Sequence, residues 1–154
     1  MASVTIVCTD GSDLAIQAGS AGLALLQPTD RVMIVTVVDG IDPSLTVDGS
    51  GHAGPSMTQK QFDELREEAL STAERSLTQT AAALGVSNAE TRMVEGTPGQ
   101  TLCALAEELA ASALVMGTRG RGGIKRAFLG SVSDYVVRNA PCPVVVIGET
   151  AASG

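Results

Sequence analysis

The chain has 154 residues, of which 44% are hydrophobic and 18% charged, the composition of one globular domain and not of a disordered chain. Ten lysines and arginines against seventeen acidic residues give a formal net charge of -7, so the average field of the molecule repels nucleic acids and anionic membranes. The aromatic residues are Phe62, Phe128 and Tyr135, too few for stacking on single-stranded bases. We therefore expect neither a nucleic-acid nor a membrane partner.

The cysteines and the histidine exclude further classes of site. Cys8, Cys103 and Cys142 are far apart in the sequence, and His52 is the one histidine. There is no Cys-x-x-Cys pair and no Cys/His cluster, so we predict neither a disulfide framework nor a structural zinc site. The chain shows no secretory leader and no apolar run of membrane length, and these features favour a reducing cytoplasm.

The first part of the chain predicts two strands with a helix between them. Residues 4–8 and 31–38 are apolar and β-branched, as in strands that are covered on both faces. Ser12 is a suitable N-cap for a helix over residues 13–26. The apolar stripe of that helix consists of Leu14, Ala18, Ala21 and Leu25.

A loop and a long helix follow. Glycines and prolines punctuate residues 40–57 and predict a flexible loop. Thr58 and Gln61 fit a capping box for a helix over residues 59–84, and Gly85 fits its C-cap. The predicted buried stripe of this helix is Phe62, Leu65, Ala69, Ala73, Leu77, Ala81 and Leu84.

The remaining elements again alternate. Thr97, Pro98 and Gln100 have the pattern of a helix start with a capping box. Strands are expected at 89–95, 113–116 and 143–147, and a further helix at about 130–139. We expect one domain over residues 1–148 and a frayed tail over 149–154. The alternation predicts a doubly wound α/β fold, whose ligands bind at the carboxyl ends of the strands near the switch in strand order. The residues that matter should follow the first, second and fourth strands.

The segment after the fourth strand is rich in glycine and in basic side chains. Gly130 and Ser131 lie where the next helix begins, and free amides at such a position favour a phosphate. Four of the ten basic side chains cluster there: Arg119, Arg121, Lys125 and Arg126. This concentration favours a small anion, and the alternative is a simple turn with solvated arginines. The segment has no Walker A sequence, and no Gly-x-Gly-x-x-Gly follows the first strand.

Two more residues follow strands. Asp10 stands after the first strand, where a carboxylate accepts hydrogen bonds from a ribose or holds a metal; the alternative is a turn with an N-cap. Val37, at the end of the second strand, offers an apolar contact and backbone amides to a flat ring, or is simply a buried valine.

Taken together, these segments resemble the universal stress protein family, specifically its ATP-binding branch. The family's motif Gly-x2-Gly-x9-Gly-Ser/Thr corresponds here to Gly117, Gly120 and Gly130-Ser131. Residues 9–12, 36–39, 96–98 and 141–146 are similar too, so the resemblance covers essentially the whole chain. It implies a three-layer, Rossmann-like sandwich of the adenine nucleotide alpha hydrolase type, with a five-stranded parallel sheet in the order 3-2-1-4-5.

The resemblance also implies a ligand and a set of contacts. The ligand would be ATP, accompanied by Mg²⁺ as a triphosphate usually is. Asp10 would bind the ribose or organise a metal, Val37 would line the adenine pocket, and Met116 and Gly117 would border the ribose and phosphates. The other binding residues would be Thr9, Arg119, Gly120, Gly130, Ser131, Val132 and Ser133. The family further suggests a homodimer through the last strand, Val144–Ile147.

No catalytic residue stands out from the sequence. Asp134 lies one turn into a helix, His52 lies in the flexible loop, and the cysteines have no basic partner. We therefore expect a nucleotide-binding regulatory module of the stress response, with at most slow ATP hydrolysis. The alternatives are a true ATPase or phosphotransferase, a sensor of AMP or a cyclic nucleotide, and an interaction protein that leaves its nucleotide fold unused. The sequence does not indicate a protein partner.

Overall fold

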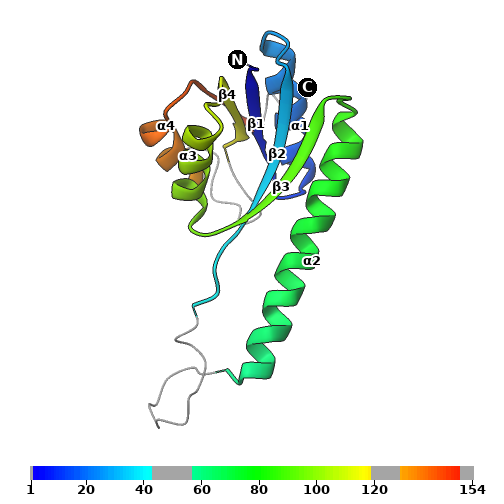
Figure 1. Cartoon of the computed structure of the whole chain (residues 1–154), viewed down its shortest axis with the longest axis vertical. Helices are drawn as coiled ribbons and strands as arrows, with labels where there is room; N and C mark the ends of the chain where they lie inside the picture. The colour runs from blue at the N-terminus through cyan, green and yellow to red at the C-terminus, as the bar shows by residue number, and fades with distance from the viewer. Residues whose placement is uncertain (1, 43–56, 119–128, 150–154) are drawn as a thin grey trace.

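A computed structural model of the chain describes residues 2–42, 57–118 and 129–149. The described strands form one parallel sheet in the order β3-β2-β1-β4-β5. They are β1 (Val4–Cys8), β2 (Arg31–Val38), β3 (Ala89–Glu95), β4 (Ala113–Gly117) and β5 (Val144–Ile147). The helices are α1 (Asp13–Leu25), α2 (Gln59–Leu84), α3 (Pro98–Glu108) and α4 (Ser131–Asn139) (Figure 1). The predicted fold class and strand order are confirmed.

Helices cover both faces of the sheet, which gives three layers (Figure 1). The core under α3 and α4 includes Ile6, Val35, Leu114 and Val136. The core under α1 and α2 includes Val7, Ile34, Val115 and Leu77. Neighbouring residues of one strand are thus buried on opposite faces, which explains why these strands are continuously apolar. None of the described helices is long and apolar enough to cross a bilayer.

The residues that α1 buries differ from the predicted apolar stripe. The residues it buries are Ala15, Ala18, Gly19 and Gly22, whereas Leu25 is 74% exposed. A Cβ atom on Gly22 would lie 2.2 Å from Cγ1 of Val115, so α1 lies against β4 through residues that have little or no side chain. The expectation for Leu25 was wrong because this close approach turns the helix toward its small residues. The N-cap is confirmed: the Ser12 hydroxyl accepts a hydrogen bond from the Ala15 amide at 3.2 Å.

The ends of α2 are confirmed, but its buried stripe is confirmed only in part. Thr58 and Gln61 form the capping box, and Gly85 is the C-cap with φ +59°. The N-terminal part of α2 extends beyond the sheet (Figure 1), and Leu65 there is 44% exposed. Polar Ser76 and Thr80 are buried beside Ala73 and Leu77.

The start of α3 shows a smaller difference. Thr97 is the N-cap and Pro98 the first helical residue, but the Thr97 side chain makes no capping hydrogen bond. The capping box expected from Thr97 and Gln100 was therefore wrong in that respect.

Thr5, on the central strand, provides a stability prediction. It is 0% exposed, and its hydroxyl has no hydrogen-bond partner in the described part of the chain. Thr5→Val keeps the shape and removes an unsatisfied polar group, so the free energy of unfolding should rise by about 1 kcal/mol. Urea unfolding measures this change, and a Thr5→Val protein less stable than wild type would contradict the assignment.

Candidate functional site

The carboxyl ends of β1, β2 and β4 meet where the strand order reverses. β1 lies between β2 and β4, with Cys8 paired to Val35 and Val7 paired to Val115. After β1 the chain enters α1 on one face of the sheet, and after the segment that follows β4 it enters α4 on the other face. This is the position at which doubly wound sheets bind ligands, and the predicted segments after β1, β2 and β4 leave the sheet there.

Asp10 lies in the turn between β1 and α1. Its Oδ1 accepts a hydrogen bond from the Ser12 amide at 2.9 Å, which holds the carboxylate in place. Its Oδ2 is buried, and no donor in the described residues reaches it. Because a buried polar atom without a partner is costly, a ligand hydroxyl or a cation is the kind of partner that this oxygen lacks.

The first backbone amides of α4 have no hydrogen-bond partner among the described residues. Gly130 is the N-cap and carries no side chain that could cap the helix. The first helical hydrogen bond runs from the Asp134 amide to the Gly130 carbonyl at 2.9 Å. The amides of Ser131, Val132 and Ser133 therefore have no partner within the helix. Together with the positive end of the helix dipole, they have the geometry that binds phosphates and carboxylates.

Backbone hydrogen bonds tie the start of α4 to the end of β4. The Gly130 amide donates to the Thr118 carbonyl at 2.8 Å, and the Thr118 amide donates to the Ile147 carbonyl at 3.1 Å. The Ser133 hydroxyl is 3.0 Å from the carbonyls of both Thr118 and Gly130, and Ser133 is 2% exposed. Its hydroxyl proton therefore goes to the backbone, and its amide is the group left to contact a ligand.

The other predicted site residues divide between the two faces of the sheet. Val37 and Met116 lie on the face under α3 and α4, the face on which α4 begins. Met116 is 6% exposed, whereas Val37 is half-buried and so more accessible to a ring. Thr9 points to the opposite face, where its hydroxyl lies 2.8 Å from that of Thr80. The structure thus does not bring the Thr9 side chain together with Val37 and Met116.

Part of the predicted site lies outside the described residues. Gly117 is described as the last residue of β4, paired with Ile147. Arg119 and Gly120 are not among the described residues, and neither are Arg121, Lys125 and Arg126 of the basic cluster.

All three thiols border the core under α3 and α4, although they are far apart in the sequence. Burial first, and then the neighbouring Cys103 and Cys142 thiols, together raise the pKa of the Cys8 thiol to about 12. Burial raises the pKa of Cys103 as well, and that of Cys142 rises through burial and then through Cys103. Protonated thiols are weak nucleophiles, so these three cysteines are poor candidates for nucleophilic chemistry.

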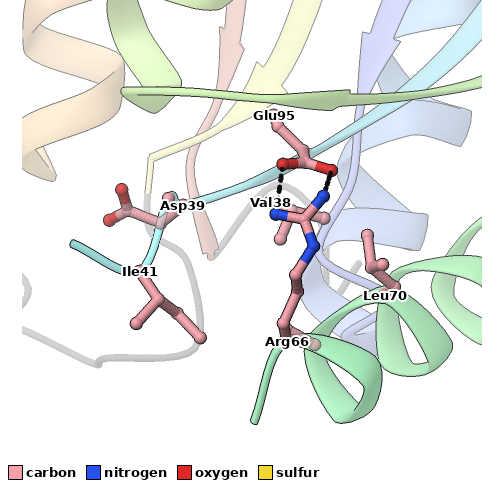
Figure 2. Close-up of a pocket in the computed structure, with 8 residues that line it drawn as sticks. Val38, Asp39, Ile41, Arg66, Leu70 and Glu95 are labelled. Carbon is pink, nitrogen blue, oxygen red and sulfur yellow. Dashed lines mark hydrogen bonds and ion pairs between the residues drawn. The ribbon is translucent and has the colours of Figure 1, made fainter. Parts of the chain in front are cut away.

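A small pocket opens to solvent between α2 and the ends of β2 and β3 (Figure 2). Val38, Ile41 and Leu70 contribute apolar lining to this pocket. Arg66 and Glu95 point toward each other and form two hydrogen bonds of 2.9 and 3.0 Å. None of the predicted site residues lines this pocket, which lies at the carboxyl ends of β2 and β3.

Sequence reasoning missed two residues of α2 that reach the turn carrying Asp10. The Ser76 hydroxyl donates toward the Asp10 carbonyl at 3.1 Å, and the Thr80 hydroxyl meets that of Thr9. The signal in the sequence is that Ser76 and Thr80 lie four residues apart among the apolar residues of the stripe. Such hydroxyls also occur in helices without a tertiary role, because they bond to the carbonyl four residues back.

Comparison with known proteins places this fold in a family. The model of the universal stress protein family matches residues 1–148. A universal stress protein of Methanocaldococcus jannaschii is 30% identical over 142 residues, which cover 92% of this chain and 79% of the relative. The solved structure of UspA from Lactobacillus plantarum aligns with a TM-score of 0.67 at 25% identity, over 94% of this chain and 97% of that one.

Two solved structures of similar fold contain adenine nucleotides. A universal stress protein in complex with cAMP aligns with a TM-score of 0.58 at 24% identity, over 95% of this chain and 97% of that one. A family protein of Arabidopsis thaliana with AMP bound aligns with a TM-score of 0.61 at 19% identity, over 95% of this chain and 91% of that one. At these identities the likeness shows the fold. The match to the family model over almost the whole chain shows that the protein belongs to the universal stress protein family.

Proposed function

We propose that the protein is an adenine-nucleotide-binding regulatory module of the stress response, with ATP as its ligand. The observation that carries the proposal is Asp10 Oδ2, which is buried and without a donor in the described residues, at the same edge of the sheet as the free amides of α4. A carboxylate oxygen accepts hydrogen bonds from ribose hydroxyls, and helix N-terminal amides donate to phosphates. The AMP and cAMP held by proteins of this fold support the ligand class.

Each predicted residue has a role in this proposal. Val37 lines the adenine pocket, and Met116 and Gly117 border the ribose and phosphates. The phosphates are held by Arg119, by the backbone of Gly120, and by Ser131, Val132 and Ser133 through their amides. The Gly130 amide donates to Thr118 instead, so Gly130 contributes by carrying no side chain where the phosphates approach. Thr9 contributes to the site indirectly, because its hydroxyl contacts Thr80 of α2.

Mg²⁺ accompanies ATP in the proposal. The described residues hold no group of three or more His, Cys, Asp or Glu side chains that could hold a metal ion. Mg²⁺ is commonly bound through one or two carboxylates together with phosphate oxygens. Asp10, with its donor-free Oδ2, fits the place of that carboxylate.

A homodimer through β5 is also part of the proposal. β5 lies at one edge of the sheet and, among the described strands, pairs with β4 alone. Its valines at positions 144–146 are only partly buried. An apolar edge with free backbone groups favours pairing with a second chain. We place this dimer in the cytoplasm and regard residues 1–148 as one universal stress protein domain, with 149–154 as its tail.

The described side chains around the start of α4 support slow hydrolysis. Asp134, the acid in its first turn, forms an ion pair with Arg138 at 3.0 Å. The Ser133 hydroxyl donates to the backbone. Neither group is placed as a general base for water, so ATP should persist once it is bound.

The test is the nucleotide content and turnover of the purified protein. Heat-denatured protein, purified without added ligand, should release ATP. With saturating ATP and Mg²⁺, turnover should stay well below ~1 s⁻¹, the low end for ordinary enzymes. Faster turnover would favour the ATPase or phosphotransferase alternative, and release of AMP or a cyclic nucleotide would favour the sensor.

A further inference from the structure

A directed chain of hydrogen bonds runs from the turn after β1 into α2. The Gly11 amide donates to Thr9 Oγ1 at 3.0 Å. The Thr80 hydroxyl donates to the Ser76 carbonyl at 2.7 Å. In the 2.8 Å contact between the two threonine hydroxyls, Thr9 is therefore the donor and Thr80 the acceptor. Each hydroxyl accepts one bond and donates one, which leaves a single direction for the chain.

The Ser76 side chain contacts the same turn. Its Oγ lies 3.1 Å from the Asp10 carbonyl and 2.9 Å from the Thr72 carbonyl. Gly11 faces it with φ +79°, and a Cβ atom there would lie 2.5 Å from Ser76 Oγ. The turn and α2 are therefore in direct contact, with no space for a side chain between them.

This contact is buried and involves Thr9 and Gly11, the residues on either side of Asp10. Thr9, Ser76 and Thr80 are 7%, 3% and 0% exposed. Buried hydrogen-bond networks whose members are satisfied fix local geometry, because any displacement leaves a polar atom without a partner. The Ser12 amide holds Oδ1 of Asp10, so the position of the turn decides where Oδ2 points.

We propose that Ser76 and Thr80 are positioning residues of the nucleotide site: they hold the turn after β1 so that Asp10 Oδ2 faces the ligand. This inference rests on the proposed nucleotide function. It makes α2 a determinant of affinity through hydroxyls that do not touch the ligand. It also explains why Thr9, with its side chain turned toward α2, belongs to the site.

The first experiment compares two substitutions at Thr80. Thr80→Val keeps the shape and removes the hydroxyl, whereas Thr80→Ser keeps the hydroxyl. Equilibrium dialysis should show that the Kd for ATP rises about tenfold in Thr80→Val, the effect of losing one well-placed hydrogen bond. Thr80→Ser should bind within about twofold of wild type, because it restores the bond to Thr9.

The second experiment compares two serines whose hydroxyls donate to backbone carbonyls near opposite ends of β1. Ser76 Oγ donates toward the Asp10 carbonyl just after β1, and Ser112 Oγ donates to the Val4 carbonyl at 2.9 Å at the start of β1. Ser76→Ala should raise the Kd, and Ser112→Ala should leave it unchanged. An equal rise in both variants would assign the effect to general stability and overturn the inference.

A double-mutant cycle separates positioning from general damage. If Thr80 acts through Asp10, Thr80→Val should not weaken binding further in an Asp10→Ala background, whereas independent effects would add. The inference would be overturned if a folded Thr80→Val protein had the wild-type Kd, or if the two effects in the cycle were additive. Neither result would contradict the proposed nucleotide site. A wild-type protein without saturable nucleotide binding would instead overturn the proposed function, and the inference with it.

Discussion

Gly130→Val should abolish adenine nucleotide binding and leave the fold intact. Gly130 has φ −63° and ψ 161°, extended backbone that valine adopts without strain. The branched side chain would stand where a phosphate must approach the first amides of α4. Hydrogen bonds from two such amides to a charged group contribute about 3 kcal/mol together, so the Kd should rise at least ~100-fold.

Equilibrium dialysis against ATP and an unfolding curve measure the two halves of this prediction. Ala24→Val adds a branched side chain at an exposed position of α1 and should change neither the Kd nor the fold. A folded Gly130→Val protein that binds ATP as tightly as wild type would place the phosphates away from α4.

Gly22→Ala should lower the free energy of unfolding by about 2 kcal/mol. The new Cβ would lie 2.2 Å from Cγ1 and 3.3 Å from Cβ of Val115, which is 0% exposed. Either α1 moves away from the sheet or Val115 leaves its rotamer, and such overpacking costs about 3 kcal/mol at the upper end of its usual range. The better helix propensity of alanine offsets only about 1 kcal/mol.

Urea unfolding of a double-mutant cycle tests this contact. Val115→Ala makes room for the new methyl group, so Gly22→Ala/Val115→Ala should be more stable than the two single effects predict in sum. Gly40→Ala is the control, because a Cβ atom there would meet nothing within 4 Å. Wild-type stability of Gly22→Ala would mean that α1 lies farther from β4 than the structure shows.

The same glycine shows what the sequence could and could not predict of the fold. β1 and β2 have the predicted bounds, because strands buried on both faces are apolar throughout and the turns between them interrupt that pattern. The edge strand β3 also has its predicted bounds, although its residues are only partly apolar. Apolar spacing could not predict which face of α1 packs against the sheet. Close approach depends on side chains that are missing at Gly19 and Gly22, and a pattern of hydrophobic residues weights Leu25 instead.

The residues of the candidate site also differ in whether the sequence could predict them. Asp10 and Gly130 could be singled out because one follows a strand and the other closes a spaced glycine motif. Ser76 and Thr80 could not, since helical hydroxyls commonly bond to the carbonyl four residues back, as Thr78 does with Glu74 at 3.0 Å. Only their tertiary partners after β1 set them apart. Gly120 stays a prediction of the motif, and Arg119 stays a prediction of the basic cluster.

The most direct test of the nucleotide site is equilibrium dialysis of nucleotide-free wild-type protein against labelled ATP with Mg²⁺. Our account predicts saturable binding of one ATP per chain, held between Asp10 and the start of α4. Its affinity should fall when Asp10 is replaced by alanine. Absence of saturation up to millimolar ATP, AMP and cAMP would contradict it.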